Sequence, residues 1–236
     1  MPPKWFPLSV WRKYPGGAGA APPQTVEKRR RRMTLLSFDL VVWDFDGVLN
    51  RNLPQETYVW AASLAADRGY DPVSFEEVVF GSGKFAEVMC GRLDLLDVVA
   101  EWLSGQGAEE DADQFLAHWF EHEACPDAES GLWLDACHHR KVIGTNNELR
   151  RTDYIEKDAG FGARVDRVFS SGRIGAVKPD AAFYQAIEDW AGLSGGRILL
   201  IDDNARYIAG ARRRGWGAFH FTDETRHRLP GILGID

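Results

Sequence analysis

The fold of this chain is decided by the stretch Val41-Val42-Trp43-Asp44-Phe45-Asp46-Gly47-Val48-Leu49. An apolar run that begins at Phe38 stops abruptly at two carboxylates and a glycine, which indicates a buried strand of a parallel sheet. Asp44 and Asp46 are two residues apart, so in an extended backbone both project to one side. Two carboxylates in one small pocket repel each other unless a cation or a proton offsets them. Asp and Gly are also common in turns, so this stretch alone leaves a plain turn open.

Composition and charge restrict the class of protein. The 236 residues carry a net charge of -7, but residues 1–32 carry +7 and the remainder therefore -14. An acidic body argues against nucleic acid as the main partner, because phosphate backbones would be repelled. Three scattered cysteines without a C-x-x-C motif favour a reducing cytoplasm over a disulfide framework. No stretch approaches the roughly 18 to 20 apolar residues that span a bilayer, so no membrane partner is expected.

The first 33 residues are predicted to be a disordered basic tail. Pro, Gly and Ala dominate residues 15–23, and the basic run Lys28–Arg32 follows. A nucleic-acid or membrane-surface patch is the functional alternative for that run.

Residues 51–127 are predicted to form an all-helical domain inserted directly after the first strand. Apolar residues recur at helical spacing from Pro54 to Ala66, and Ser74-x-x-Glu77 matches a capping box. Further amphipathic helices are expected over residues 85–90, 93–103 and 112–122, and a helix over 128–137 leads back to the core.

From Lys141 onward, strands alternate with helices. Strands are predicted over residues 142–144, 167–169, 198–201 and 218–221, and helices over 148–158, 179–190 and 205–214, the second with Pro179 near its first turn. This alternation predicts βαβ units and a parallel sheet. The expected fold is α/β, a doubly wound, Rossmann-like core of residues 34–50 and 128–236 with a helical cap.

Polar residues follow three further strands of the predicted sheet. They are Thr145 and Asn146, Lys178 in Lys178-Pro179-Asp180, and Asp202 with Asp203. Each group alone has an ordinary explanation, as a helix N-cap or as a solvated loop charge. In a parallel sheet, however, all of them lie on the same edge as Asp44 and Asp46, where open α/β sheets place their chemistry.

These four groups resemble the motifs of the haloacid dehalogenase superfamily, over about residues 38–222. The resemblance implies a Mg²⁺-dependent phosphatase with a helical cap of the first type. Asp44 is then the nucleophile and a metal ligand, and Asp46 is the acid–base group whose backbone carbonyl also faces the metal. Lys178 offsets negative charge near Asp44. For the remaining positions the resemblance implies phosphate binding by Thr145 and Asn146, and metal binding by Asp203 and Asp202, with the direct ligand of that pair left open.

Asp46 separates two chemistries within the superfamily. Its dehalogenases do not keep a second Asp two residues after the nucleophile, so phosphoryl transfer is favoured. The expected partner is a small phosphorylated metabolite, with a sugar phosphate and a homodimer left open. A phosphomutase or phosphotransferase, and a non-catalytic binding module on the same fold, remain as alternatives.

Two further features are weaker candidates for a metal site or a substrate contact. His118, His122 and Cys125 have a spacing that places soft ligands on one helix face, although a packed or surface face is favoured. Arg92, in the cap with Trp60, Phe85 and Met89, is a candidate for a second anionic group of a substrate, against the plainer interpretation of a solvated arginine.

Overall fold

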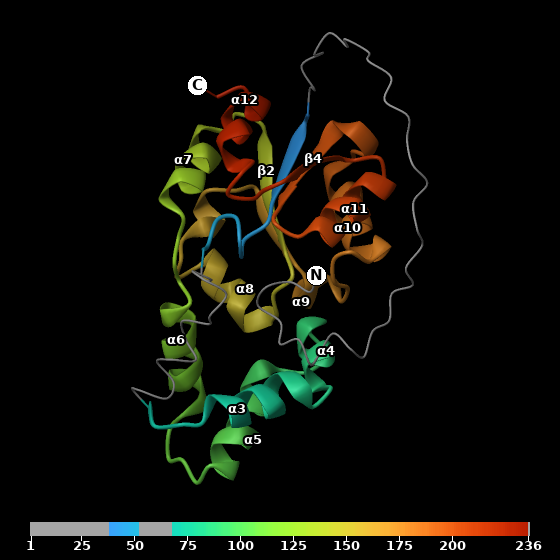
Figure 1. The fold of residues 1–236 in the computed structure, drawn as a ribbon. Helices are drawn as coiled ribbons and strands as arrows, with labels where there is room; N and C mark the ends of the chain where they lie inside the picture. Colours follow the sequence, from blue (N-terminus) through green and yellow to red (C-terminus); the bar gives the residue numbers. More distant parts are fainter. Residues whose placement is uncertain (1–37, 52–67, 236) are drawn as a thin grey trace.

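The computed structural model describes residues 38–51 and 68–235 of the chain (Figure 1). The predicted tail and the first helix predicted for the insert, over Pro54 to Ala66, lie outside the described residues.

A parallel sheet forms the centre of the molecule, and within the described residues it has five strands in the order β3-β2-β1-β4-β5. The strands are β1 (Leu40–Trp43), β2 (Arg140–Thr145), β3 (Arg167–Ser170), β4 (Ile198–Asp202) and β5 (Gly217–His220). All neighbouring strands pair in parallel. The predicted α/β class is therefore confirmed.

Helices cover both faces of this sheet. Figure 1 places α10 (Ala181–Ala191) and α11 (Ala205–Arg213) on one side, and α7 (Ala128–Ala136) and α12 (Leu229–Leu233) on the other. Alternate residues of β1 enter separate apolar clusters, with Val41 and Trp43 in one and Leu40 and Val42 in the other. All four side chains are fully buried, which is typical of a central strand of a doubly wound fold.

A helical segment lies between β1 and β2 in the sequence and at one end of the core in space (Figure 1). Its helices are α3 (Pro72–Phe75), the π-helical η2 (Glu76–Gly81), α4 (Lys84–Met89), α5 (Leu95–Gly105) and α6 (Ala112–His122). They enclose an apolar core of their own, rich in aromatic rings such as Phe75, Trp102 and Phe115. The predicted helical insert is thus present, and α6 has the predicted bounds. The domain limits of 51 and 127 stay a prediction.

One predicted helix start is wrong, and another is displaced by two residues. Ser74 lies inside α3, and Asp71 is the N-cap because its carboxylate accepts hydrogen bonds from the backbone N–H groups of Val73 (3.0 Å) and Ser74 (3.3 Å). Asp71 directly precedes Pro72, whose fixed φ suits the first turn. The helix predicted to begin at Pro179 begins two residues later, at Ala181 with Asp180 as its N-cap, so Pro179 lies just before its first turn.

The remaining helices are short. They are α8 (Leu149–Glu156), η3 (Phe161–Ala163), α9 (Ser171–Ile174), η4 (Gly195–Arg197) and η5 (Arg226–Arg228). In the described part of the chain, no helix is both long and apolar enough to cross a membrane.

Candidate functional site

The strand register brings the predicted site residues to one edge of the sheet. Trp43 of β1 is aligned with Ile143 of β2 on one side and with Ile201 of β4 on the other. The next residue along each strand therefore lies at the same level, which places Asp44 beside Asp202. A hydrogen bond of 2.9 Å from the Asp44 N–H to the Ile201 carbonyl extends this pairing by one residue.

Three carboxylates gather at this edge. Asp44, Asp202 and Asp203 each offer an oxygen, and these three atoms lie within 4.8 Å of one another. Asp44 and Asp202 are buried, and Asp203 is partly buried. Clustered carboxylate oxygens at the end of a sheet are hard ligands of the kind that Mg²⁺ prefers.

Both carboxylate oxygens of Asp202 accept hydrogen bonds within the protein. One oxygen of Asp202 accepts a hydrogen bond from Lys178 Nζ (2.7 Å), and the other accepts one from the backbone N–H of Asn204 (2.8 Å). Asn204, rather than Asp202, caps α11, since its side chain accepts from the Arg206 N–H (2.9 Å). Both oxygens of Asp202 are thus engaged by groups of the protein, and which of Asp202 and Asp203 contacts a metal directly stays a prediction.

Lys178 lies between the nucleophile candidate and Asp202. Its Nζ is 3.0 Å from Asp44 Oδ1 and 2.7 Å from Asp202 Oδ2, and its side chain is completely buried. Burial opposes the charge of this lysine, but the two carboxylates outweigh burial and raise its pKa. Burial also raises the pKa of Asp44, and Asp202 adds to this rise while Lys178 opposes it. Because its side chain is completely buried, Lys178 is not a solvated loop charge, and this alternative explanation is wrong.

Gly47 allows the loop after β1 to pass close to Asp203. Its φ is +85°, and a Cβ atom at this position would lie 2.5 Å from Asp203 Cγ. Any other residue would have to displace the Asp203 carboxylate as well as adopt a strained backbone. The chain therefore turns sharply beside the site at Gly47.

Asp46 has a separate environment from the three clustered carboxylates. Its Oδ1 accepts a hydrogen bond from Asn50 Nδ2 (2.9 Å) and its Oδ2 accepts one from Asn147 Nδ2 (3.0 Å). Nη2 of the buried Arg151 lies 3.6 Å from Asp46 Oδ1. Sequence reasoning assigned no role to these three residues. Asn147 could have been found from its place in Thr145-Asn146-Asn147. Arg151 could have been found because it lies four residues, or about one helical turn, after Asn147.

Thr145 and Asn146 lie at the end of β2, but neither caps the helix that follows. Glu148 caps α8, because its carboxylate accepts from the N–H groups of Arg150 (2.6 Å) and Arg151 (2.5 Å). Asn146 instead holds the backbone of Lys178, donating to its carbonyl (3.1 Å) and accepting from its N–H (2.7 Å). The Thr145 hydroxyl accepts a hydrogen bond from Asn147 Nδ2 (2.8 Å).

The two weaker candidate sites have ordinary structural roles. His122 Nδ1 lies 2.8 Å from the His118 carbonyl, and the backbone N–H of Cys125 donates to Asn50 Oδ1 (2.7 Å). Among the residues that the structure describes, only Asp44, Asp202 and Asp203 form a group able to share a metal ion.

The residues of the helical segment that were candidates for substrate contact have other partners or environments. Arg92 is exposed and forms two hydrogen bonds to the Glu87 carboxylate, at 2.6 and 3.0 Å. Phe85 and Met89 are buried in the core of the helical segment, and Trp60 lies outside the described residues.

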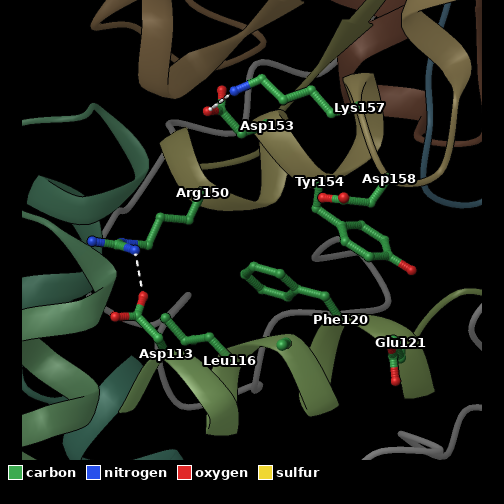
Figure 2. Close-up of a pocket in the computed structure, with 10 residues that line it drawn as sticks. Asp113, Leu116, Phe120, Glu121, Arg150, Asp153, Tyr154, Lys157 and Asp158 are labelled. Carbon is green, nitrogen blue, oxygen red and sulfur yellow. Dashed lines mark hydrogen bonds and ion pairs between the residues drawn. The ribbon is translucent and has the colours of Figure 1, made fainter. Parts of the chain in front are cut away.

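A cavity of about 470 Å³ lies between α6 and α8 (Figure 2). The rings of Phe120 and Tyr154 line it, and an ion pair of 2.9 Å joins Arg150 to Asp113 at its side. None of the strand-end carboxylates lines this cavity. It is therefore separate from the site described above.

Known proteins similar to this chain agree with its fold. Residues 38–215 match the family model of haloacid dehalogenase-like hydrolases. A Mycobacterium tuberculosis protein named as a phosphatase is 47% identical over 92 residues, which are 39% of this chain and 42% of that protein. The chain thus matches less than half of the length of that relative.

Solved structures with the same fold come from several hydrolases. A predicted HAD-like family hydrolase from Porphyromonas gingivalis superimposes with a TM-score of 0.66 at 19% identity, covering 84% of this chain and 97% of that one. A HAD family enzyme of Bacteroides thetaiotaomicron, solved with magnesium and inorganic phosphate, gives 0.65 at 15% identity, covering 79% and 95%. L-2-haloacid dehalogenase from Xanthobacter autotrophicus gives 0.54 at 20% identity, covering 84% of each chain. With the family model matched over most of its length and the strand-end aspartates in place, this chain belongs to the haloacid dehalogenase-like hydrolases.

Proposed function

We propose that this hydrolase is a magnesium-dependent phosphatase that acts on a small phosphorylated metabolite through an aspartyl-phosphate. The observation that carries the proposal is the grouping of Asp44, Asp202 and Asp203 around one point, with Lys178 buried against two of them. A phosphate ester is a dianion, so a carboxylate nucleophile can approach it only where positive charge is concentrated.

The three carboxylates fit a magnesium ion by their donor chemistry. Asp44 and Asp203 would hold it directly, and Asp202 would support the site through Lys178 and the Asn204 backbone. The backbone carbonyl of Asp46 is proposed as a further ligand. When bound, the ion would supply positive charge to the phosphate oxygens and favour the ionised form of Asp44.

The reaction would proceed in two steps at Asp44. An oxygen of Asp44 attacks phosphorus, the bond from phosphorus to the leaving oxygen breaks, and Asp46 gives that oxygen a proton. Asp46 then takes a proton from water, whose oxygen attacks phosphorus, so that phosphate leaves and Asp44 is regenerated. Lys178, the Thr145 hydroxyl and the Asn146 N–H are proposed to bind the phosphate oxygens.

Asp46 supports phosphate rather than halide chemistry. The fold itself does not distinguish them, because structures of both a dehalogenase and a magnesium–phosphate complex superimpose on this chain. Asp46, held by Asn50 and Asn147, is an acid–base group that a dehalogenase of this superfamily does not keep. The name of the Mycobacterium tuberculosis relative agrees with this choice.

The proposal is tested with p-nitrophenyl phosphate and a panel of phosphorylated metabolites, sugar phosphates among them. Purified protein should release phosphate in the presence of Mg²⁺, and EDTA should stop the reaction. Asp44→Asn should abolish turnover by removing the nucleophile while keeping a folded protein, as checked by thermal unfolding. Turnover that persists in Asp44→Asn would refute the assigned nucleophile, and an inactive wild-type protein would favour a binding module.

The remaining expectations concern setting and assembly. A cytoplasmic location and a homodimer stay predictions. Thiol labelling in cells and size-exclusion chromatography with light scattering would test them.

A further inference from the structure

A buried chain of charges runs from the strand-end site into the helical segment. Arg151 of α8 lies at its centre, with a side chain only 6% exposed. Its Nη2 is 3.6 Å from Asp46 Oδ1, and its Nη1 is 3.1 Å from Oε2 of Glu123. Glu123 directly follows α6, so the guanidinium joins the proposed acid–base group to the segment that returns from the cap.

The position of Arg151 is built rather than accidental. Its guanidinium carbon lies 5.4 Å from the centre of the Phe120 ring and 6.0 Å from that of Tyr154. The N-cap Glu148 fixes the start of its helix, and a hydrogen bond of 3.0 Å from the Gly172 N–H to the Asn147 carbonyl ties the residues just before that helix to α9. A buried arginine is costly unless its charge is offset, and here two carboxylates from separate parts of the fold offset it.

Hydrogen bonding alone does not explain why Asp46 has this neighbour. Asn50 and Asn147 already donate one hydrogen bond to each oxygen of Asp46. At 3.6 Å, Arg151 is an ion-pair partner beyond hydrogen-bond distance, so it adds an attraction that restrains Oδ1 of Asp46 beside the two hydrogen bonds. The same charge is held from the other side by Glu123, on the cap side of the molecule.

We propose that Arg151 is a positioning residue, which holds the Asp46 carboxyl in the orientation for proton transfer and is itself held in place by Glu123 of the cap return. This inference rests on the proposed phosphatase function, in which Asp46 gives a proton to the leaving oxygen. It predicts that the benefit of Arg151 depends on how much the leaving group needs that proton.

Two classes of substrate separate this role from a merely structural one. A p-nitrophenolate leaving group is stable as an anion at neutral pH and needs little protonation, whereas an alkoxide needs a full proton. Loss of Arg151 should therefore lower kcat/KM for an alkyl phosphate and largely spare kcat/KM for p-nitrophenyl phosphate. We expect the alkyl-to-aryl ratio to fall about tenfold, which is less than the roughly 10²- to 10⁴-fold that acid–base catalysis contributes as a whole.

The experiment compares Arg151→Gln with a matched neighbour, Arg150→Gln. Arg150 also joins α8 to the helical segment, through Asp94 (2.5 Å) and Asp113 (2.9 Å), but these ion pairs lie at the surface and do not include Asp46. If general tethering of the cap were the cause, both variants would change the two substrates alike. We expect the ratio to stay at the wild-type value in Arg150→Gln and to fall only in Arg151→Gln.

A double variant keeps the test valid if Arg151→Gln alone unfolds. Arg151→Gln leaves Glu123 as an uncompensated buried charge, and Glu123→Gln in the same chain removes it. The double variant should fold and still show the selective loss on alkyl phosphates. A ratio that is unchanged or raised in the folded variant would overturn the inference. A wild-type protein inactive on both substrates would instead overturn the proposed function, and this role of Arg151 with it.

Discussion

Lys178 carries its charge in the interior because two carboxylates face it. Asp44 and Asp202 lie on neighbouring strands, at 3.0 and 2.7 Å from its Nζ, and the backbone of Lys178 is itself held by the side chain of Asn146. The four side chains form one unit in which each polar group depends on the next. Removal of one member should therefore cost more than the loss of a single hydrogen bond.

The change Lys178→Met tests this dependence. It leaves two buried carboxylates without their cation, so we expect the free energy of unfolding to fall by about 3–5 kcal/mol. The double variant Lys178→Met/Asp202→Asn removes one of those charges and should regain about 1 kcal/mol or more, while remaining inactive. Urea denaturation without divalent cations measures both. Equal stability of the single and double variants would show that carboxylate repulsion is not the cause.

The site residues that directly follow a strand were predictable from the sequence. The residues that contact them from other elements were not. Asp44 and Asp202 were predictable neighbours because parallel strands end at one edge. The partners of Asp46 were not, because Asn147 lies 101 residues away from it and the contact depends on how α8 begins. Glu123 had no signal at all, since its contact with Arg151 requires the placement of the helical segment on the core.

At the scale of elements, the helical segment approaches the core through a pair of glycines. Gly91, in the turn between α4 and α5, has a φ of +67°, and a Cβ atom there would collide with the carbonyl oxygen of Gly172 in α9. Gly172 is also closely packed, since its own Cβ would lie 2.8 Å from the backbone nitrogen of Leu149 at the start of α8. Backbone therefore meets backbone where α4 reaches α9.

Gly91→Ala should separate this contact, and Gly107→Ala is its matched control. Gly107 has the same φ of +67°, but a Cβ atom there has no neighbour within 4 Å among the described residues. Both changes carry the left-handed backbone cost of about 1–2 kcal/mol. Only Gly91→Ala should add a further loss of stability and a fall in kcat/KM, because the cap turn must move off α9. Equal effects on unfolding and on turnover would contradict the proposed contact.

The elements themselves were largely predictable, and their ends less so. The alternation of apolar strands and amphipathic helices after Lys141 specified the parallel sheet, because each period depends on local sequence. Helix starts depend on single hydrogen bonds, and the competition between Asp71 and Ser74 for the start of α3 was decided by the adjacent Pro72. A hydrophobic period that extends over many residues is therefore easier to predict from sequence than which of two nearby residues caps a helix.

At the scale of the whole molecule, the two chain crossings between core and helical segment run side by side. The Arg51 N–H donates to the Cys125 carbonyl (2.7 Å), and the Asp127 N–H donates to the Leu49 carbonyl (2.9 Å). The C-terminal part of the chain holds both crossings. Arg51 pairs with Asp223 at 2.6 Å, and Arg226 donates to both oxygens of Asp127 at 2.8 and 3.0 Å.

Arg226 should therefore control how firmly the helical segment is attached to the core. Its guanidinium is mostly buried over the Phe221 ring, and its partner Asp127 also caps α7. Arg226→Met leaves Asp127 with only the longer contact to Arg51 (3.8 Å), so we expect a loss of about 2 kcal/mol in stability. Amide hydrogen exchange should accelerate in residues 49–51 and 124–131 while β4 at the centre of the sheet keeps its protection. Arg228→Met, an exposed change in the same turn, should leave both regions as they are. Faster exchange confined to residues 222–228 would show that the C-terminal segment does not hold the crossings.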